Sequence, residues 1–292
     1  MSVITAAAGI TLDLAAPLPR EPFYTLLKTL RRLDPPEFIE MPSDERWFNG
    51  VHVYGYPTSL PGTWDPCAEG TFREKEEGGA VPAPRFDSFG LYLPVTCSSF
   101  GMSWNDFRER ARVVLRATQS FAIEQALAAG VSLSTNTNPA FGDTNALIVG
   151  GGAVSPGTGL AWLEKQIALS GRFGIIHAPP EVATSWPLEL HPDGLMRTKA
   201  GTLVAIGAGY SGVSADGVAP AIGQSYAFAT GPVRVYLSDI DFSGESLNGW
   251  LDTTINEVTF RAEKFALGIW EGLPQADPDI QQAAAVLVDW TP

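Results

Sequence analysis

The sequence is poor in the residues that most often build catalytic and metal centres. Its 292 residues include only three histidines and two cysteines, Cys67 and Cys97, which form no Cys-x-x-Cys pair. Such a small supply of ligands leaves little for a metal site. A disulfide between Cys67 and Cys97 is conceivable, and two reduced or buried thiols are the interpretation that we favour.

Positive charge is also scarce. Lysine and arginine total 19 against 32 acidic residues, so the formal net charge is −13, and the longest basic run is Arg31–Arg32. Because an acidic surface repels phosphate backbones, this balance argues against nucleic-acid binding through a basic face. The first 19 residues have no basic start, and their apolar run is too short for a membrane span. We therefore expect a cytoplasmic chain without a transmembrane helix.

What the sequence does have is apolar bulk and many turn formers. Apolar residues make up 45% of the chain and charged residues 17%, with 30 glycines and 23 prolines. This composition excludes a disordered chain and predicts more turns, loops and edges than a helical bundle needs. The length suits one large domain or two closely joined subdomains.

The N-terminal third predicts little regular structure. Residues 1–20 are expected to form an extended apolar arm, and 21–33 a short amphipathic helix that ends before Pro35 and Pro36. Residues 37–90 predict a strand or two and then a long, exposed, extended loop. A loop of this length is unusual in a compact monomer, so we expect it to reach over a neighbouring subunit.

The clearest helix begins at Ser103 and ends at about Ala129. Ser103 is a candidate N-cap with Asp106 three residues later, and Gly130 is a candidate C-terminal stop. Some 26 residues at 1.5 Å each predict a rod of about 39 Å. The expected apolar face comprises Trp104, Phe107, Ala111, Val114, Leu115, Phe121 and Ile123.

The rest of the chain alternates between short helices and strands. Residues 131–158 predict an irregular segment, and Leu160, Leu163 and Ile167 are the inward face of a helix over 159–170. The other expected elements are a strand at 173–178, a helix at 179–189, a tight turn at 191–194, strands at 202–206, 225–230 and 232–240, a short helix near 246–253, and a long bent strand or strand pair over 256–272. Without a regular βαβ repeat, the fold class is α+β.

One motif, Gly207–Gly212, matches the Gly-x-Gly-x-x-Gly pattern of dinucleotide-binding proteins. It directly follows the predicted strand 202–206. The dinucleotide interpretation requires a helix to begin there, so that its N-terminus can hold the pyrophosphate. Glycines and a proline interrupt the residues that follow, so we interpret the motif as part of a flexible loop up to about residue 223.

Other polar residues also favour structural interpretations. Asp239 and Asp241, with Glu245 nearby, could bind a divalent cation, but we expect them to face water. His177 ends a buried strand, where a hydrogen-bonded packing role is commoner than catalysis. Glu74–Glu77 is expected to be a solvated charge run or to pair with a neighbouring subunit. For Trp47 and Trp64, burial in the core and a place in an interface between subunits both stay open. We therefore predict no catalytic, cofactor-binding or metal-binding residue.

The order of elements resembles the Hong-Kong-97-like fold of tailed-phage major capsid proteins, which encapsulins share. The resemblance spans residues 100–272. Three stretches carry it: GLAWLEKQIALSGRFGIIHAPPEVATSW (159–186), GLMRTKAGTLVAIGAGYSG (194–212) and NEVTFRAEKFALGIWEG (256–272), with Arg261, Phe265 and Gly268 in the last. YAFATGPVRVYLSD (226–239) also fits the strand that returns to the P-domain. The second stretch departs from the family pattern, because Thr202–Val204 contains no proline.

The resemblance implies a domain organisation. We expect an N-terminal arm and short helix (1–36), a strand and extended E-loop-like region (37–99), the spine helix of the P-domain and its following loop (100–156), an A-domain-like α/β segment (157–231), and the closing strands of both domains with a C-terminal tail (232–292).

It also implies a function. The chain would be a major capsid protein, located in the virion after synthesis in the host cytoplasm, and not an enzyme. It would self-assemble through pentamers and hexamers into an icosahedral shell around DNA that it does not bind sequence-specifically, with scaffold, portal or decoration proteins as possible partners. No cofactor is implied. The alternatives are an encapsulin-type nanocompartment, a head–tail connector or tail subunit, and a hydrolase or nucleotide-binding enzyme that uses residues 207–212.

Overall fold

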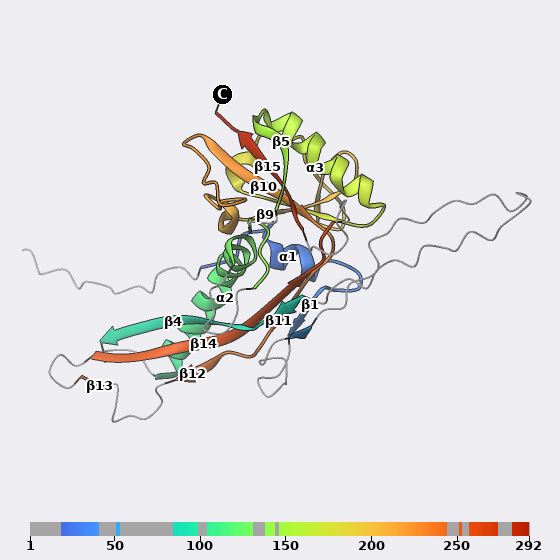
Figure 1. Ribbon diagram of the computed structural model, residues 1–292. Helices are drawn as coiled ribbons and strands as arrows, with labels where there is room; N and C mark the ends of the chain where they lie inside the picture. The colour runs from blue at the N-terminus through green and yellow to red at the C-terminus, as the bar shows by residue number, and fades with distance from the viewer. Residues whose placement is uncertain are drawn as a thin grey trace, which may run out of the picture.

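Figure 1 shows a computed structural model of the chain. The structure describes residues 19–40, 51–52, 84–98, 104–130, 138–143, 146–243, 251–252, 257–273 and 282–291. The predicted arm (up to residue 18), most of the predicted extended loop, and Trp47, Trp64, Cys67, Glu74–Glu77, Ser103 and Glu245 lie outside these residues. None of the described helices is long and apolar enough to cross a membrane.

A seven-stranded mixed sheet forms the upper lobe in Figure 1. Its strands, in spatial order, are β5 (Leu147–Val154), β15 (Ala284–Asp289), β10 (Gln224–Thr230), β6 (Ile175–Ala178), β9 (Leu203–Ile206), β8 (Met196–Arg197) and β7 (Glu189–Leu190). The interior strand β10 is almost fully buried, as its apolar run YAFAT requires. Although β15 comes last in the chain, it pairs with both β5 and β10.

Helix α3 (Pro156–Ser170) covers one face of this sheet and contacts β5, β10 and β15. Ser155 caps its N-terminus, Pro156 occupies the first turn, and Gly171 ends it in the left-handed conformation (φ 63°). Leu160, Leu163 and Ile167 point inward, as predicted. These side chains make a core with β6, β9 and β10 that is separate from the larger core of the molecule.

A six-stranded sheet forms the elongated lower lobe. Its path is β1 (Phe38–Glu40), β11 (Val233–Leu237), β14 (Glu257–Trp270) and β12 (Asp241–Ser243), while β4 (Phe89–Ser98) and β13 (Leu251–Asp252) also pair with β14. Strands β4 and β14 run antiparallel for ten residues and make the long ribbon of Figure 1. The remaining strands, β2 (Val51–His52) and β3 (Arg85–Phe86), form a separate pair.

Helix α2 (Trp104–Ala129) joins the two lobes. It packs along β4 and β14, and its C-terminal half reaches the short helix α1 (Leu26–Arg31) and the 3₁₀ turn η2 (Ala208–Tyr210). The helix has the predicted extent of 26 residues, and Gly130 (φ 82°) ends it as expected. Phe107, Ala111, Leu115 and Ile123 are buried as predicted, whereas Phe121 is 49% exposed, so its place on the apolar face was wrong.

Several other sequence predictions are corrected by the structure. Helix α4 spans only Pro180–Ala183, so the predicted helix over 179–189 is too long. Pro187 disfavours helical backbone at Trp186, and the Thr184 and Ser185 hydroxyls bond back to carbonyls of the last turn. The segment 131–158 is not irregular throughout, since β5 lies in it and α3 begins at Pro156. Residues 251–252 are strand where a short helix was expected, and the predicted helix over 21–33 is confined to Leu26–Arg31.

Candidate functional site

The two lobes meet at a junction built around one buried carboxylate. Glu124 lies on α2 and is 1% exposed. Its Oε1 accepts a hydrogen bond from the Leu26 amide of α1 at 2.9 Å, and its Oε2 accepts one from the Gly209 amide at 3.4 Å. One side chain therefore ties together three segments that are distant in sequence.

The predicted Gly-x-Gly-x-x-Gly motif lies at this junction. It forms the three-residue turn η2 in place of a long helix, and Gly207, Gly209 and Tyr210 are buried against α2. A Cβ at Gly209 would lie 2.5 Å from both the Glu124 Cβ and the Phe121 carbonyl oxygen, and one at Gly207 would overlap the Glu124 carboxyl group. These two glycines are needed for close packing, so the flexible-loop interpretation was wrong for this part of the segment.

The geometry also disagrees with dinucleotide binding. That function needs a helix N-terminus whose amides point at a pyrophosphate. Here the amide of Gly209 points at the Glu124 carboxyl group, and the turn closes through a bond from the Tyr210 amide to the Gly207 carbonyl at 3.3 Å. The Glu124 side chain already takes the amide that a phosphate would need, so the motif has no free place for one.

Burial dominates the electrostatics of Glu124. Loss of hydration raises its pKa to about 7, although the two backbone amides act in the opposite direction. Nearby Glu21 raises this pKa further. Glu21 itself accepts hydrogen bonds from the hydroxyls of Thr25 and Ser120, and it lies 3.6 Å from Lys28 and 3.8 Å from Arg31.

His177 of β6 lies next to Tyr210 at the same junction. Its Nδ1 lies 3.1 Å from the Tyr210 hydroxyl and its Nε2 lies 2.9 Å from the Thr230 hydroxyl. Because the Thr230 hydroxyl donates to the Gly231 carbonyl, Nε2 must carry the proton and Nδ1 accepts from Tyr210. Complete burial lowers the pKa of His177 to about 3, and burial raises that of Tyr210. The predicted hydrogen-bonded packing role of His177 is confirmed.

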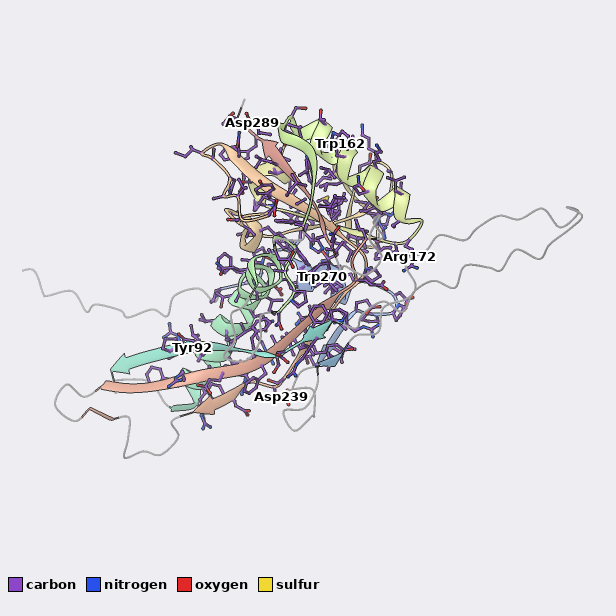
Figure 2. All side chains as sticks on the ribbon, in the orientation of Figure 1. Tyr92, Trp162, Arg172, Asp239, Trp270 and Asp289 are labelled. Carbon is purple, nitrogen blue, oxygen red and sulfur yellow. The ribbon has the colours of Figure 1, made fainter. Side chains whose placement is uncertain are left out.

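Aromatic rings carry this packing into the lower lobe. The Phe141 ring lies 4.5 Å from the His177 ring and meets Trp270 edge-on at 5.2 Å. Trp270, at the end of β14, donates to the Pro139 carbonyl at 3.1 Å, and Figure 2 shows it between the two lobes. His177 is thus linked through ring packing to the long ribbon.

The other predicted polar residues do not gather at the junction. Asp239 and Asp241 are exposed on the lower lobe, as expected, and Figure 2 shows Asp239 there. Within the described ranges, no group of three or more His, Cys, Asp or Glu side chains is placed to hold a metal ion. Cys97 lies on β4, where its backbone pairs with Val258.

Sequence reasoning missed Glu124, although a signal for it exists. Helical spacing puts Glu124 on the same face as Ser120 and Leu127, three to four residues away, and both are buried. An acidic residue inside an apolar stripe calls for a buried partner. Nothing in the sequence indicates that the partner is a pair of amides, 98 residues earlier and 85 residues later.

Comparisons with known proteins bear on this architecture. No protein-family model and no curated protein sequence matches the chain. Among solved structures, it is similar to the capsid of an empty GTA particle, with a TM-score of 0.52, 12% identity, and coverage of 100% of this chain and 99% of that one.

Two further structures are similar over nearly the whole chain. The capsid of Ralstonia phage GP4 has a TM-score of 0.53 at 11% identity, covering 98% of this chain and 97% of its own. A chain of Mycobacterium phage Cain has a TM-score of 0.52 at 12% identity, covering 99% and 97%. The chain therefore has the α+β fold of phage capsid proteins.

Proposed function

We propose that this chain is the major capsid protein of a tailed bacteriophage, which self-assembles into an icosahedral shell around the DNA genome. The observation that carries the proposal is the likeness in fold to two capsid structures over 98–100% of this chain and 97–99% of theirs. Because the likeness covers nearly the whole chain, it includes both lobes and the segments that join them.

The parts of the fold then take the following roles in our proposal. Helix α2 is the spine helix, and together with β4 and β14 it makes the P-domain. The seven-stranded sheet with α3 is the A-domain, which lies at the centre of a capsomer. Residues 37–99 contain the E-loop, and 1–36 the N-terminal arm. The A-domain also takes in β5 and β15, which lie outside residues 157–231.

The chemistry of the surface is compatible with a shell. A net charge of −13 lets a shell enclose DNA without binding it tightly. Apolar side chains that the subunit leaves exposed, such as Ile222 at 105% and Tyr92 at 68%, are available for contacts between copies. Symmetry multiplies each such contact, so each can be weak. The role is structural, and the location that we propose is the virion after synthesis in the host cytoplasm.

Two other roles compete with this one. An encapsulin-type compartment would use the same fold and is distinguished by a cargo protein with a docking tail. A head–tail connector or tail subunit would form rings or tubes. Scaffold, portal or decoration proteins are possible partners of such a shell in our proposal.

The test is electron microscopy of the purified full chain after size exclusion. We expect closed shells or five- and six-fold capsomers. Ile222→Asp, which changes a fully exposed side chain, is expected to reduce assembly while circular dichroism stays unchanged. Rings or tubes would contradict the proposal in favour of a connector or tail subunit. A persistent monomer that nucleotides stabilise would favour the third alternative, a nucleotide-binding enzyme that uses residues 207–212.

A further inference from the structure

We propose that Glu124 is a proton-dependent latch, which holds α1 and the glycine turn η2 against α2 when protonated and loosens the junction between the lobes when ionised. This inference does not depend on the function proposed above, since it concerns contacts within one chain. It rests on the geometry of the carboxyl group and on the absence of a cation beside it among the described residues.

The carboxyl group of Glu124 lies where three segments of the chain meet. Glu124 bridges the amide of Leu26 and the amide of Gly209, so these two hydrogen bonds join the N-terminal helix, the long helix and the upper lobe. Gly207 and Gly209 have no side chain, which lets the turn lie directly on the carboxyl group. A change in this one group therefore acts on all three segments at once.

The titratable groups that face this carboxyl group come from the N-terminal segment and from η2. The charged group that faces it from the N-terminal segment is Glu21, which itself pairs with Lys28 and Arg31. From η2 it faces Tyr210, behind which His177 of β6 lies. The described residues give Glu124 hydrogen bonds from amides and no ion pair. An ionised Glu124 is thus buried beside another carboxylate without a cation of its own.

The burial of Glu124 sets the sign of the pH dependence. Burial raises the pKa of Glu124 from an ordinary 4.5 to about 7. The closed junction therefore keeps a proton that the opened junction releases, so closure is favoured at acid pH and weakens as the pH rises from 4.5 to 7. His177 acts in the opposite direction: with a folded pKa of about 3, it stabilises the closed form above pH 6.5 and loses that effect as the pH falls.

Because these two groups oppose each other, the test compares variants and does not rely on the wild type alone. Thermal unfolding of the full chain is measured for wild type and Glu124→Gln between pH 5.5 and 7.5, in the same assembly state. Glutamine keeps the shape and an acceptor oxygen but cannot ionise. We expect the melting temperature of Glu124→Gln relative to wild type to increase by about 3 °C across this range.

Glu181→Gln is the matched control. Glu181 also uses both carboxyl oxygens, which accept from the hydroxyls of Ser211 at 3.1 Å and Ser225 at 2.8 Å, but it is only half-buried. Its difference from wild type is expected to stay constant between pH 5.5 and 7.5. A constant difference for Glu124→Gln as well would overturn the latch.

A second measurement needs no variant and covers the case in which Glu124→Gln does not fold. Hydrogen exchange of the wild-type chain, corrected for the intrinsic effect of pH, is followed at pH 5.5 and 8. Peptides that contain Leu26 and Gly209 are expected to lose protection roughly tenfold relative to Phe228 in β10 at the higher pH. Equal protection at both pH values would also overturn the proposal.

Discussion

Gly209 lies where the upper lobe packs closely against α2, and its missing side chain decides whether the junction can close. A methyl group there would lie 2.5 Å from the Glu124 Cβ and from the Phe121 carbonyl oxygen, and 2.7 Å from the Gln125 amide nitrogen. Two of these atoms belong to the backbone of a long helix and cannot move aside. We predict that Gly209→Ala lowers the free energy of unfolding by about 2–3 kcal/mol, measured by urea denaturation.

Gly157 provides the matched control for this substitution. It lies in the first turn of α3, and a Cβ built there meets nothing within 4 Å. Alanine is the better helix former, so Gly157→Ala is expected to leave stability unchanged or raise it by up to about 1 kcal/mol. Equal losses for the two variants would mean that the junction is not the close contact described above.

At the scale of single residues, roles that depend on neighbours in the sequence could be predicted, and roles that depend on distant tertiary contacts could not. The packing role of His177 followed from an apolar strand and its flanking prolines, which are local features. The role of Gly207 and Gly209 did not follow, because their reason is the side chain of Glu124 on a helix about 85 residues earlier. Local spacing shows that a segment is rich in glycine, and only the tertiary contact shows whether it is flexible or closely packed.

At the scale of elements, the contact between β14 and α2 contains an unusual buried cation. Lys264 lies on the face of β14 that carries Ala262, Ala266 and Gly268, and it is 5% exposed. Its Nζ donates to the Gln119 Oε1 at 3.3 Å. Burial lowers the pKa of Lys264 from 10.5 to about 8, although nearby Glu40 acts in the opposite direction. The strand can approach the helix only because the other residues on that face are small.

This lysine gives a second pH-dependent prediction, with the opposite sign to the latch. Above pH 8 the folded chain releases a proton that the unfolded chain keeps, so stability rises with pH. We expect the free energy of unfolding to increase by about 2 kcal/mol between pH 7.5 and 9.5 in wild type, measured with urea. Lys264→Met is expected to remove this increase, while Lys199→Met, at an exposed position, should retain it. If Lys264→Met kept the full increase, another group would be responsible.

Elements with strong local patterns were predicted well. The helix Trp104–Ala129 and the long strand β14 combine length with a clear apolar period, and α3 has a serine cap and a glycine stop. Strand β5 was missed because its sequence LIVGGGAV contains three glycines, which weaken any strand pattern. The predicted helix over 179–189 failed because Pro187 and two back-bonding hydroxyls end it early.

At the scale of the whole molecule, neither lobe is continuous in sequence. The upper sheet takes β5 from the middle of the chain and β15 from its C-terminal part, while β14 of the lower sheet lies between them in sequence. Because of this interleaving, no single stretch of the sequence contains all the strands of one sheet without strands of the other. The resemblance predicted the α+β fold correctly because it relied on the order of several elements, which survives when individual residues differ.

The interleaving also makes the last strand essential to the upper lobe. Strand β15 lies between β5 and β10, and Ala284, Ala285, Val286 and Val288 are fully buried. Removing it would leave β5 without its partner and open the core under α3. Lost burial and lost ladder hydrogen bonds together amount to roughly 5–10 kcal/mol, which is comparable with the whole stability of a domain.

We therefore predict that a chain ending at Leu273 does not fold cooperatively. Removing only Thr291 and Pro292 is the control, since Thr291 is exposed and the Trp290 amide keeps its bond to the Gly223 carbonyl at 3.1 Å. Urea denaturation followed by circular dichroism should show one cooperative transition for the control and a broad or absent one for the shorter chain. A cooperative transition in the chain that ends at Leu273 would show that the six remaining strands hold the upper lobe together without β15. In the native molecule, the upper lobe would then not depend on the return of the chain through β14, and the two lobes could fold independently.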